Sequence, residues 1–164
     1  MNAMICDEIP ADLTPLKTYA VAGEVAKVSR RAPEVFSPQG EGRLHVALMD
    51  YGCGKHVIEE LLARGCQVTC LPHDTSAEAV LALSPDGVLL SCGPGNPAEN
   101  TGCIAEIRTL LGKLPLFGIG LGHQLLALAA GAETVKLKHG HRGANQPVRE
   151  CSTGRVHITA QNHG

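Results

Sequence analysis

A short apolar run, a cluster of glycines and a helix-forming segment follow one another in residues 114–131. The run at 116–119 has the length and hydrophobicity of a buried strand in a parallel sheet. Gly118, Gly120 and Gly122 permit a sharp reversal after it, and the Leu- and Ala-rich segment beyond favours a helix. This layout is a nucleophile elbow, whose tip residue sits in strained backbone geometry above the sheet, with helix N–H groups facing the site. We expect Gly120 at the tip.

Strands and helices alternate along most of the chain. Apolar patterns predict strands at 43–50, 66–71 and 88–91, and helices at 56–64, 76–81 and 101–112. This alternation predicts an α/β fold in which helices cover both faces of a parallel sheet. The elbow and the loops at 50–55 and 92–97 then share one edge, where the strands have their carboxyl ends and where ligands bind in such folds.

The ends of the chain carry weaker patterns. Before residue 43 we expect a helical turn at 11–16, a short strand or ribbon at 18–28 and a linker at 30–40 that is rich in Pro, Gly and charge. After the elbow helix, segments at 133–138, 147–149 and 156–160 predict antiparallel ribbons apart from the main sheet.

Composition excludes several classes of function. A hydrophobic content of 44% in 164 residues suits one domain with a substantial core. The net charge of −2 offers no basic field for nucleic acid, and no apolar run approaches the roughly 20 residues of a membrane span. Asp7, Glu8 and Pro10 interrupt any signal peptide. The seven cysteines, without a CxxC pair, indicate reduced and mostly buried thiols. We therefore expect a cytoplasmic protein.

Four segments together resemble the class I (triad-type) glutamine amidotransferases. The elbow reads GIGLGHQ where the family has G-[IVL]-C-[LY]-G-[HM]-Q, and the other segments are 91–97, 136–148 and 158–164. Within the family, the chain most resembles the small chain of glutamine-hydrolysing carbamoyl-phosphate synthase. The resemblance implies a flavodoxin-like three-layer fold, truncated at both ends. Residues 1–42 would be an arm or linker left from a preceding domain, and 43–164 an incomplete amidotransferase domain.

The resemblance also implies roles for individual residues. The backbone of Gly93 and Gly95 would face glutamine, and the Leu121 N–H would join an oxyanion hole. The remaining substrate contacts would come from Gln124, Asn162 and Gly164. Without the resemblance, the loop at 93–95 could be an ordinary type II-like turn and Gln124 an ordinary polar helix residue. We interpret His123 as a structural hydrogen-bonding residue rather than a base.

Two departures from the family affect the chemistry. Gly120 stands where the family has its cysteine nucleophile, and the sequence stops at Gly164, before the region of the family's catalytic histidine and acid. Hydrolysis of glutamine requires all three groups. Cys92 lies in the neighbouring loop but would have to reproduce the elbow geometry. We therefore expect no glutaminase activity, and none from Gly120→Cys alone.

Two classes of function remain open at this point. The first is the amidotransferase component of carbamoyl-phosphate synthase, which in the family passes ammonia to a large synthetase chain, in arginine or pyrimidine biosynthesis. ATP and Mg would belong to that large chain, and no cofactor is expected here. The second is a non-catalytic pseudo-amidotransferase module that binds a partner chain or glutamine.

Other ligands are disfavoured. His139, His141 and His163 lack a Cys, Asp or Glu at intervals that would complete a zinc set, so we expect no metal. A dinucleotide fingerprint fails because His123 occupies the place of its third glycine.

Overall fold

The structure is a computed structural model that describes residues 3–19, 22–40 and 42–164. The chain divides into two compact units, Met1–Ala132 and Glu133–Gly164. Each unit is described by itself. The domain boundary predicted between residues 42 and 43 is not tested by this division and stays a prediction.

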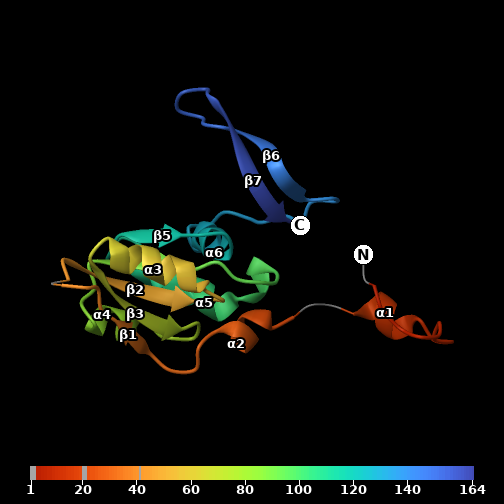
Figure 1. Cartoon of the computed structure of the whole chain (residues 1–164), viewed down its shortest axis with the longest axis horizontal. Helices are drawn as coiled ribbons and strands as arrows, with labels where there is room; N and C mark the ends of the chain where they lie inside the picture. Colours follow the sequence, from red (N-terminus) through yellow and green to blue (C-terminus); the bar gives the residue numbers. More distant parts are fainter. Residues whose placement is uncertain (1–2, 20–21, 41) are drawn as a thin grey trace. The chain divides into compact units, whose positions relative to one another are not determined.

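The first unit is built on a five-stranded sheet (Figure 1). Its strands are β1 (Glu34–Phe36), β2 (Leu44–Asp50), β3 (Cys66–Pro72), β4 (Gly87–Leu90) and β5 (Leu116–Gly118), in the order β1-β3-β2-β4-β5. β2 to β5 are parallel, and β1 is antiparallel to β3. The parallel α/β sheet predicted from the sequence is confirmed. After β2 the chain crosses to β3 on one side of it, whereas after β4 it crosses to β5 on the other side. The carboxyl ends of the neighbouring strands β2 and β4 therefore form a topological switch point.

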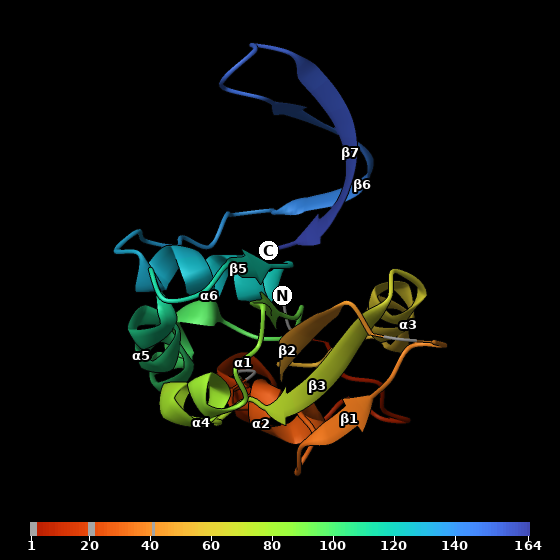
Figure 2. The same ribbon diagram turned by 90° about the vertical axis from the view of Figure 1, so that its left-hand side faces the viewer.

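Helices cover both faces of this sheet, as predicted. The helices of this unit are α1 (Thr14–Thr18), α2 (Glu24–Val28), α3 (Lys55–Ala63), α4 (Ala77–Ala82), the 3-10 helix η1 (Pro97–Glu99), α5 (Thr101–Leu110) and α6 (Leu121–Ala129), of which α3, α4, α5 and α6 supply the cover. Figure 2 shows α3 on one side of the sheet and α4, α5 and α6 on the other. Among the described residues, none of these helices has the length and hydrophobicity needed to cross a bilayer.

Successive side chains on the central strands point to opposite faces of the sheet, so the core consists of two apolar clusters, one on each face. Ala47 and Met49 of β2 pack with α4, α5 and α6, whereas Leu48 packs with Ile58 of α3 and Val68 of β3. Leu48 and Val68 are completely buried. The predicted strands and helices from residue 43 to 131 all form, with boundaries that shift by one or two residues.

Four local predictions are wrong. The stretch predicted as a strand or ribbon at 18–28 contains helix α2, although residues 20 and 21 lie outside the described residues. The stretch predicted as a linker contains β1, which pairs with β3. Residues 133–138 form no strand. Phe117 of β5 is 66% exposed rather than buried, because β5 is the last strand in the sheet order.

The second unit is an antiparallel hairpin of β6 (His141–Arg149) and β7 (Val156–His163). Its register shifts between Gly143 and Gln146, where a bulge interrupts the pairing. The hairpin forms a sheet of its own, so the predicted antiparallel ribbon is confirmed for these two segments.

Candidate functional site

The turn between β5 and α6 has the backbone of a nucleophile elbow. Gly120 adopts φ 55° and ψ −112°, a conformation that L side chains rarely take. The next residue but one, Gly122, donates its N–H to the carbonyls of Ser91 and Ile119, both at 3.0 Å. The tip predicted from the sequence is therefore in place, with glycine instead of a nucleophile.

The glycines of the elbow differ in how much space surrounds them. A Cβ atom added at Gly118 would lie 2.5 Å from the His123 backbone nitrogen, and one added at Gly122 would lie 2.2 Å from the Leu90 carbonyl oxygen. At Gly120 the nearest atom to an added Cβ is Cys92 Cβ, at 3.5 Å, an ordinary van der Waals separation. Close packing thus requires glycine at two positions, whereas the tip has room for a side chain.

Three loops meet at the tip, as the sequence predicted. A Cβ added at Gly93 would lie 2.2 Å from the Tyr51 carbonyl oxygen and 2.8 Å from the Leu121 side chain. The Cys92 thiol lies 3.8 Å from the carbonyl oxygen of Gly52. The loops that follow β2 and β4 therefore touch each other and the start of α6, at the topological switch point of the sheet.

Unpaired backbone donors collect at this edge. Within the part of the chain that the structure describes, the N–H groups of Gly93, Gly95 and Leu121 donate no hydrogen bond to a protein acceptor. Leu121 begins α6, and the first N–H groups of a helix have no carbonyl one turn earlier to bind. Free donors at a helix start suit a developing oxyanion or a bound carboxylate.

The polar side chains of α6 stand at the same end of the helix. Gln124 is half-buried, and its backbone N–H donates to the Gly120 carbonyl at 3.1 Å. His123 is exposed, and its ring forms no hydrogen bond with any described residue. The structural hydrogen bond expected for His123 is therefore not formed.

The remaining predicted residues lie in the hairpin unit. Asn162 of β7 is paired with Arg142 in the ladder, and Gly164 follows the strand. Near them, His141 Nδ1 and His163 Nε2 are 2.9 Å apart. Among the described residues, no three His, Cys, Asp or Glu side chains form a group that could hold a metal ion. The roles of Asn162 and Gly164 stay predictions.

Sequence reasoning missed a buried carboxylate behind the site. Asp50 ends β2 with only 4% of its surface exposed. Its Oδ1 accepts the N–H groups of Gly52 at 3.0 Å and Cys53 at 2.7 Å, and its Oδ2 accepts the Arg30 Nε at 2.9 Å. An acid at the end of a strand was visible in the sequence, but its partner twenty residues earlier was not.

The comparison with protein families agrees with this geometry. A model of the class-I glutamine amidotransferases matches residues 47–164, which hold the elbow and all three loops. The chain belongs to the class I glutamine amidotransferase family. The Gly93 loop and the Gly120 elbow both lie within the matched residues.

Two curated relatives show which members of the family this chain is similar to. The pyrimidine-specific small chain of carbamoyl phosphate synthase from Halalkalibacterium halodurans is 53% identical over 160 residues, which are 98% of this chain and 42% of that protein. The carbamoyl phosphate synthase small chain of Listeria monocytogenes is 56% identical over 131 residues, 80% of this chain and 36% of that one. This chain thus spans less than half the length of the curated relatives it matches.

A solved structure supports the same fold. A GMP synthase subunit from Thermoplasma acidophilum aligns with a TM-score of 0.50 and 28% identity, over 61% of this chain and 51% of that one. The two chains share a fold over the aligned part.

The thiols of this chain differ in their surroundings. Cys66, Cys70 and Cys103 are buried, Cys53 and Cys92 are half-buried, and Cys6 and Cys151 are exposed. Burial first, and then the negative charge of Asp50, raise the pKa of Cys53 to about 12. Cys53 is therefore a neutral thiol near pH 7 and a poor nucleophile.

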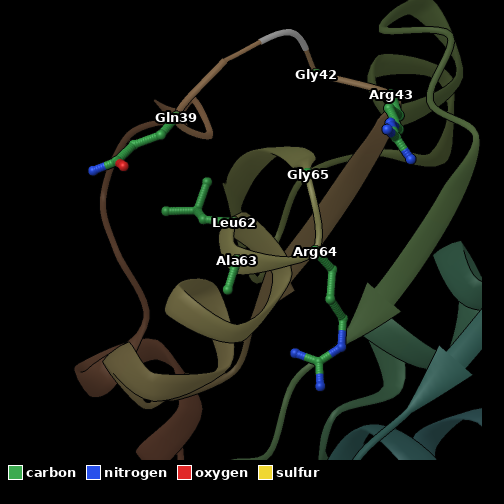
Figure 3. A pocket seen from close by; sticks show the side chains of 7 residues that line it. All are labelled: Gln39, Gly42, Arg43, Leu62, Ala63, Arg64 and Gly65. Atoms are coloured by element: carbon green, nitrogen blue, oxygen red, sulfur yellow. The ribbon is translucent and has the colours of Figure 1, made fainter.

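A separate pocket lies at the opposite edge of the sheet. It has a volume of about 680 Å³ and is lined by Gln39, Gly42, Arg43, Leu62, Ala63, Arg64 and Gly65 (Figure 3). Arg43 and Gly65 precede β2 and β3, so the pocket borders the amino ends of these strands. The elbow and its neighbouring loops lie at the carboxyl ends of the strands, and we assign this pocket no part in the candidate site.

The Asp50 carboxylate makes the stability of the site depend on pH. Burial acts to raise the pKa of Asp50, but hydrogen bonds from Cys53, Gly52 and Arg30 outweigh burial and hold it below its ordinary value. A carboxyl whose pKa is lower in the folded state stabilises the fold above its unfolded pKa of about 3.9. That stabilisation is lost as the pH falls through the folded pKa.

We therefore expect Asp50→Asn to be less stable than the wild type at pH 7 and to lose less stability on acidification. The test is urea unfolding of both proteins at pH values from 7 to 3. Asp86→Asn is a control, since the Asp86 carboxylate also accepts a backbone N–H, that of His45 at 2.7 Å, but far from the site. An equal loss of stability on acidification in wild type and Asp50→Asn contradicts this prediction.

Proposed function

We propose that this chain binds glutamine as the amidotransferase part of a carbamoyl-phosphate synthase small chain and does not hydrolyse it. The observation that carries the proposal is the elbow at Gly120, which keeps the strained φ and ψ of a catalytic tip beside the free N–H groups of Leu121, Gly93 and Gly95. Such donors recognise an amide or carboxylate oxygen without help from a side chain.

The candidate site lacks the groups that would attack glutamine. Attack on the glutamine amide needs a thiolate at the tip and a base that takes its proton. Gly120 supplies no thiol. The neighbouring Cys92 donates its S–H toward the Gly52 carbonyl, and within the described residues no imidazole hydrogen-bonds with it. The site therefore offers transition-state donors without a nucleophile.

The names of the relatives support a partner for this chain. A protein called a small chain of carbamoyl phosphate synthase assembles with a large one, and we infer the large synthetase chain as the partner here. ATP and Mg belong to that partner, and no cofactor is assigned to this chain. A cytoplasmic location and a place in arginine or pyrimidine biosynthesis are part of the same proposal.

A second candidate is a pseudo-amidotransferase module whose task is to bind a partner chain. The observation that favours it is apolar exposure on strands: Phe117 on the edge strand β5 is 66% exposed and Ile158 on β7 is 67% exposed. Apolar side chains on exposed strands are typical of surfaces that another chain covers.

Calorimetric titration with glutamine tests the first proposal. We expect saturable binding by the wild-type chain, and binding that is about threefold to tenfold weaker in Gln124→Ala because one hydrogen bond to the substrate is lost. Gln67→Ala is the matched control, since Gln67 is an exposed glutamine of β3. Ammonia release should stay at the level of the buffer.

The outcomes separate the two candidates. A folded chain that binds no glutamine contradicts the first proposal, and co-purification with the large synthetase chain would then favour the partner-binding module. Release of ammonia from glutamine by the wild-type chain contradicts the loss of catalysis.

A further inference from the structure

We propose that α2 and the residues after it form the supporting wall of the glutamine site, with Arg30 as the positioning residue that holds the loop after β2. The inference rests on the proposed function, because it assigns this segment to the same glutamine site. Residues 24–36 precede the part of the chain that matches the amidotransferase family, 47–164. The family comparison alone therefore gives them no role.

Helix α2 is anchored in the core beneath the site. Val25 is 2% exposed and belongs to the same apolar cluster as Tyr51 and Leu121. A helix of five residues is too short to be stable alone, so this burial is what holds it. The rest of α2 is thereby fixed against the site loops.

Two residues of α2 lie beside glycines of the loops. A Cβ added at Gly52 would lie 3.0 Å from Val28 Cγ2, and one added at Gly95 would lie 3.9 Å from Glu24 Cβ. The first contact supports the loop after β2 and the second supports the loop after β4. One short helix therefore lies against both loops that carry the substrate-facing glycines.

Arg30 connects this helix to the carboxylate behind the site. Its backbone N–H and its Nε both donate to Asp50 Oδ2, at 3.1 and 2.9 Å. The guanidinium also pairs with Glu34 and lies 5.7 Å from the centroid of the Phe36 ring. The side chain is thus held from three sides, and only 20% of it is exposed. A charge-assisted pair in such a place is well ordered.

The connection continues from Asp50 to the substrate-facing backbone. Asp50 Oδ1 accepts the N–H groups of Gly52 and Cys53, which fixes the path of the loop. A Cβ added at Gly52 would lie 3.4 Å from Gly93 Cα, so the two loops are in contact. A shift of Gly52 therefore displaces Gly93, whose N–H is one of the free donors. Misplaced donors lose much of their effect, since recognition depends on preorganised geometry.

The test compares Arg30→Gln with Arg31→Gln. Arg31 is the adjacent arginine, it is exposed, and it forms no ion pair among the described residues, so the control changes the same charge. We expect Arg30→Gln to weaken glutamine binding about tenfold and to move the backbone amide NMR signals of Gly52, Cys53 and Gly93. Arg30→Lys should recover part of both effects, and Arg31→Gln should change neither.

The amide signals are recorded without ligand, which separates this inference from the proposed function. If the wild type binds no glutamine but the signals still move in Arg30→Gln alone, the proposed function fails and the positioning role of Arg30 stands. If Arg30→Gln and Arg31→Gln give the same amide signals and the same affinity, the positioning role is overturned.

A second pair of variants tests the same inference if Arg30→Gln does not fold. Val28→Ala removes the methyl group that lies beside Gly52. Val35→Ala on β1 is its control, and the two side chains are 50% and 57% exposed. We expect the Gly52 signal to move only in Val28→Ala, and equal signals in both variants overturn the role of the wall.

Discussion

Gly120→Cys is expected to form a disulfide with Cys92 in the absence of reductant. The added Cβ lies 3.5 Å from Cys92 Cβ and 3.8 Å from its Cα. Disulfides join Cβ atoms about 3.5 to 4.5 Å apart, so the two thiols are within bonding reach without movement of the backbone. The tip strain that a side chain adds at φ 55°, about 1 to 3 kcal/mol, is small enough for the variant to fold.

Intact mass and thiol titration measure this bond. The oxidised variant should lack two hydrogens and show two fewer titratable thiols than the reduced one. Gly120→Ser carries the same backbone strain without a thiol, and Gly120→Cys combined with Cys92→Ser removes the partner, so neither control should lose thiols on oxidation. Full retention of thiols in oxidised Gly120→Cys would show that the tip and the Cys92 loop are not adjacent.

The expected disulfide also determines how the glutaminase activity of Gly120→Cys must be assayed. In this chain a cysteine at the tip faces a second cysteine, so only the reduced variant, or the one with Cys92→Ser, presents a free thiol to glutamine. We expect no ammonia release even then, because the thiol needs a positioned base to take its proton. His123, the histidine beside the elbow, is exposed, and its ring forms no hydrogen bond with any described residue that would hold it in place.

The elbow and its neighbouring loops were predictable because their causes are local. Glycines at alternate positions between an apolar run and a helix-forming run leave few alternatives for the backbone of Gly118, Gly120 and Gly122. The alternation of strands and helices then fixes which loops share an edge of the sheet. Gly93 and Leu121 meet for this reason, although 28 residues separate them.

The N-terminal segment was not predictable because its structure depends on distant partners. Helix α2 has only five residues, and the burial of Val25 stabilises it rather than helix propensity. Strand β1 has three residues and exists through its pairing with β3. The Arg30 to Asp50 pair joins positions that no local pattern connects. The same limit applies to Asn162, whose role follows from the family resemblance alone.

Gly122→Ala is expected to be among the most destabilising single substitutions in the chain. Its methyl group would lie 2.2 Å from the carbonyl oxygen of Leu90, which accepts the Ile119 N–H at 3.0 Å. Leu90 is completely buried in a central strand and cannot retreat. To accommodate the methyl group, α6 must move away from β4 and lose the hydrogen bond from Gly122 to Ser91. We expect a loss of about 3 kcal/mol or more.

Gly102→Ala is the matched control, because Gly102 is also in the first turn of a helix and a Cβ added there meets nothing within 4 Å. Alanine at such a position should stabilise the protein by about 0.5 kcal/mol, since glycine loses more backbone entropy on folding. Urea unfolding followed by circular dichroism measures both variants. A stability of Gly122→Ala equal to that of Gly102→Ala would mean that α6 does not press against β4, and the elbow geometry on which the glutamine site depends would then be wrong.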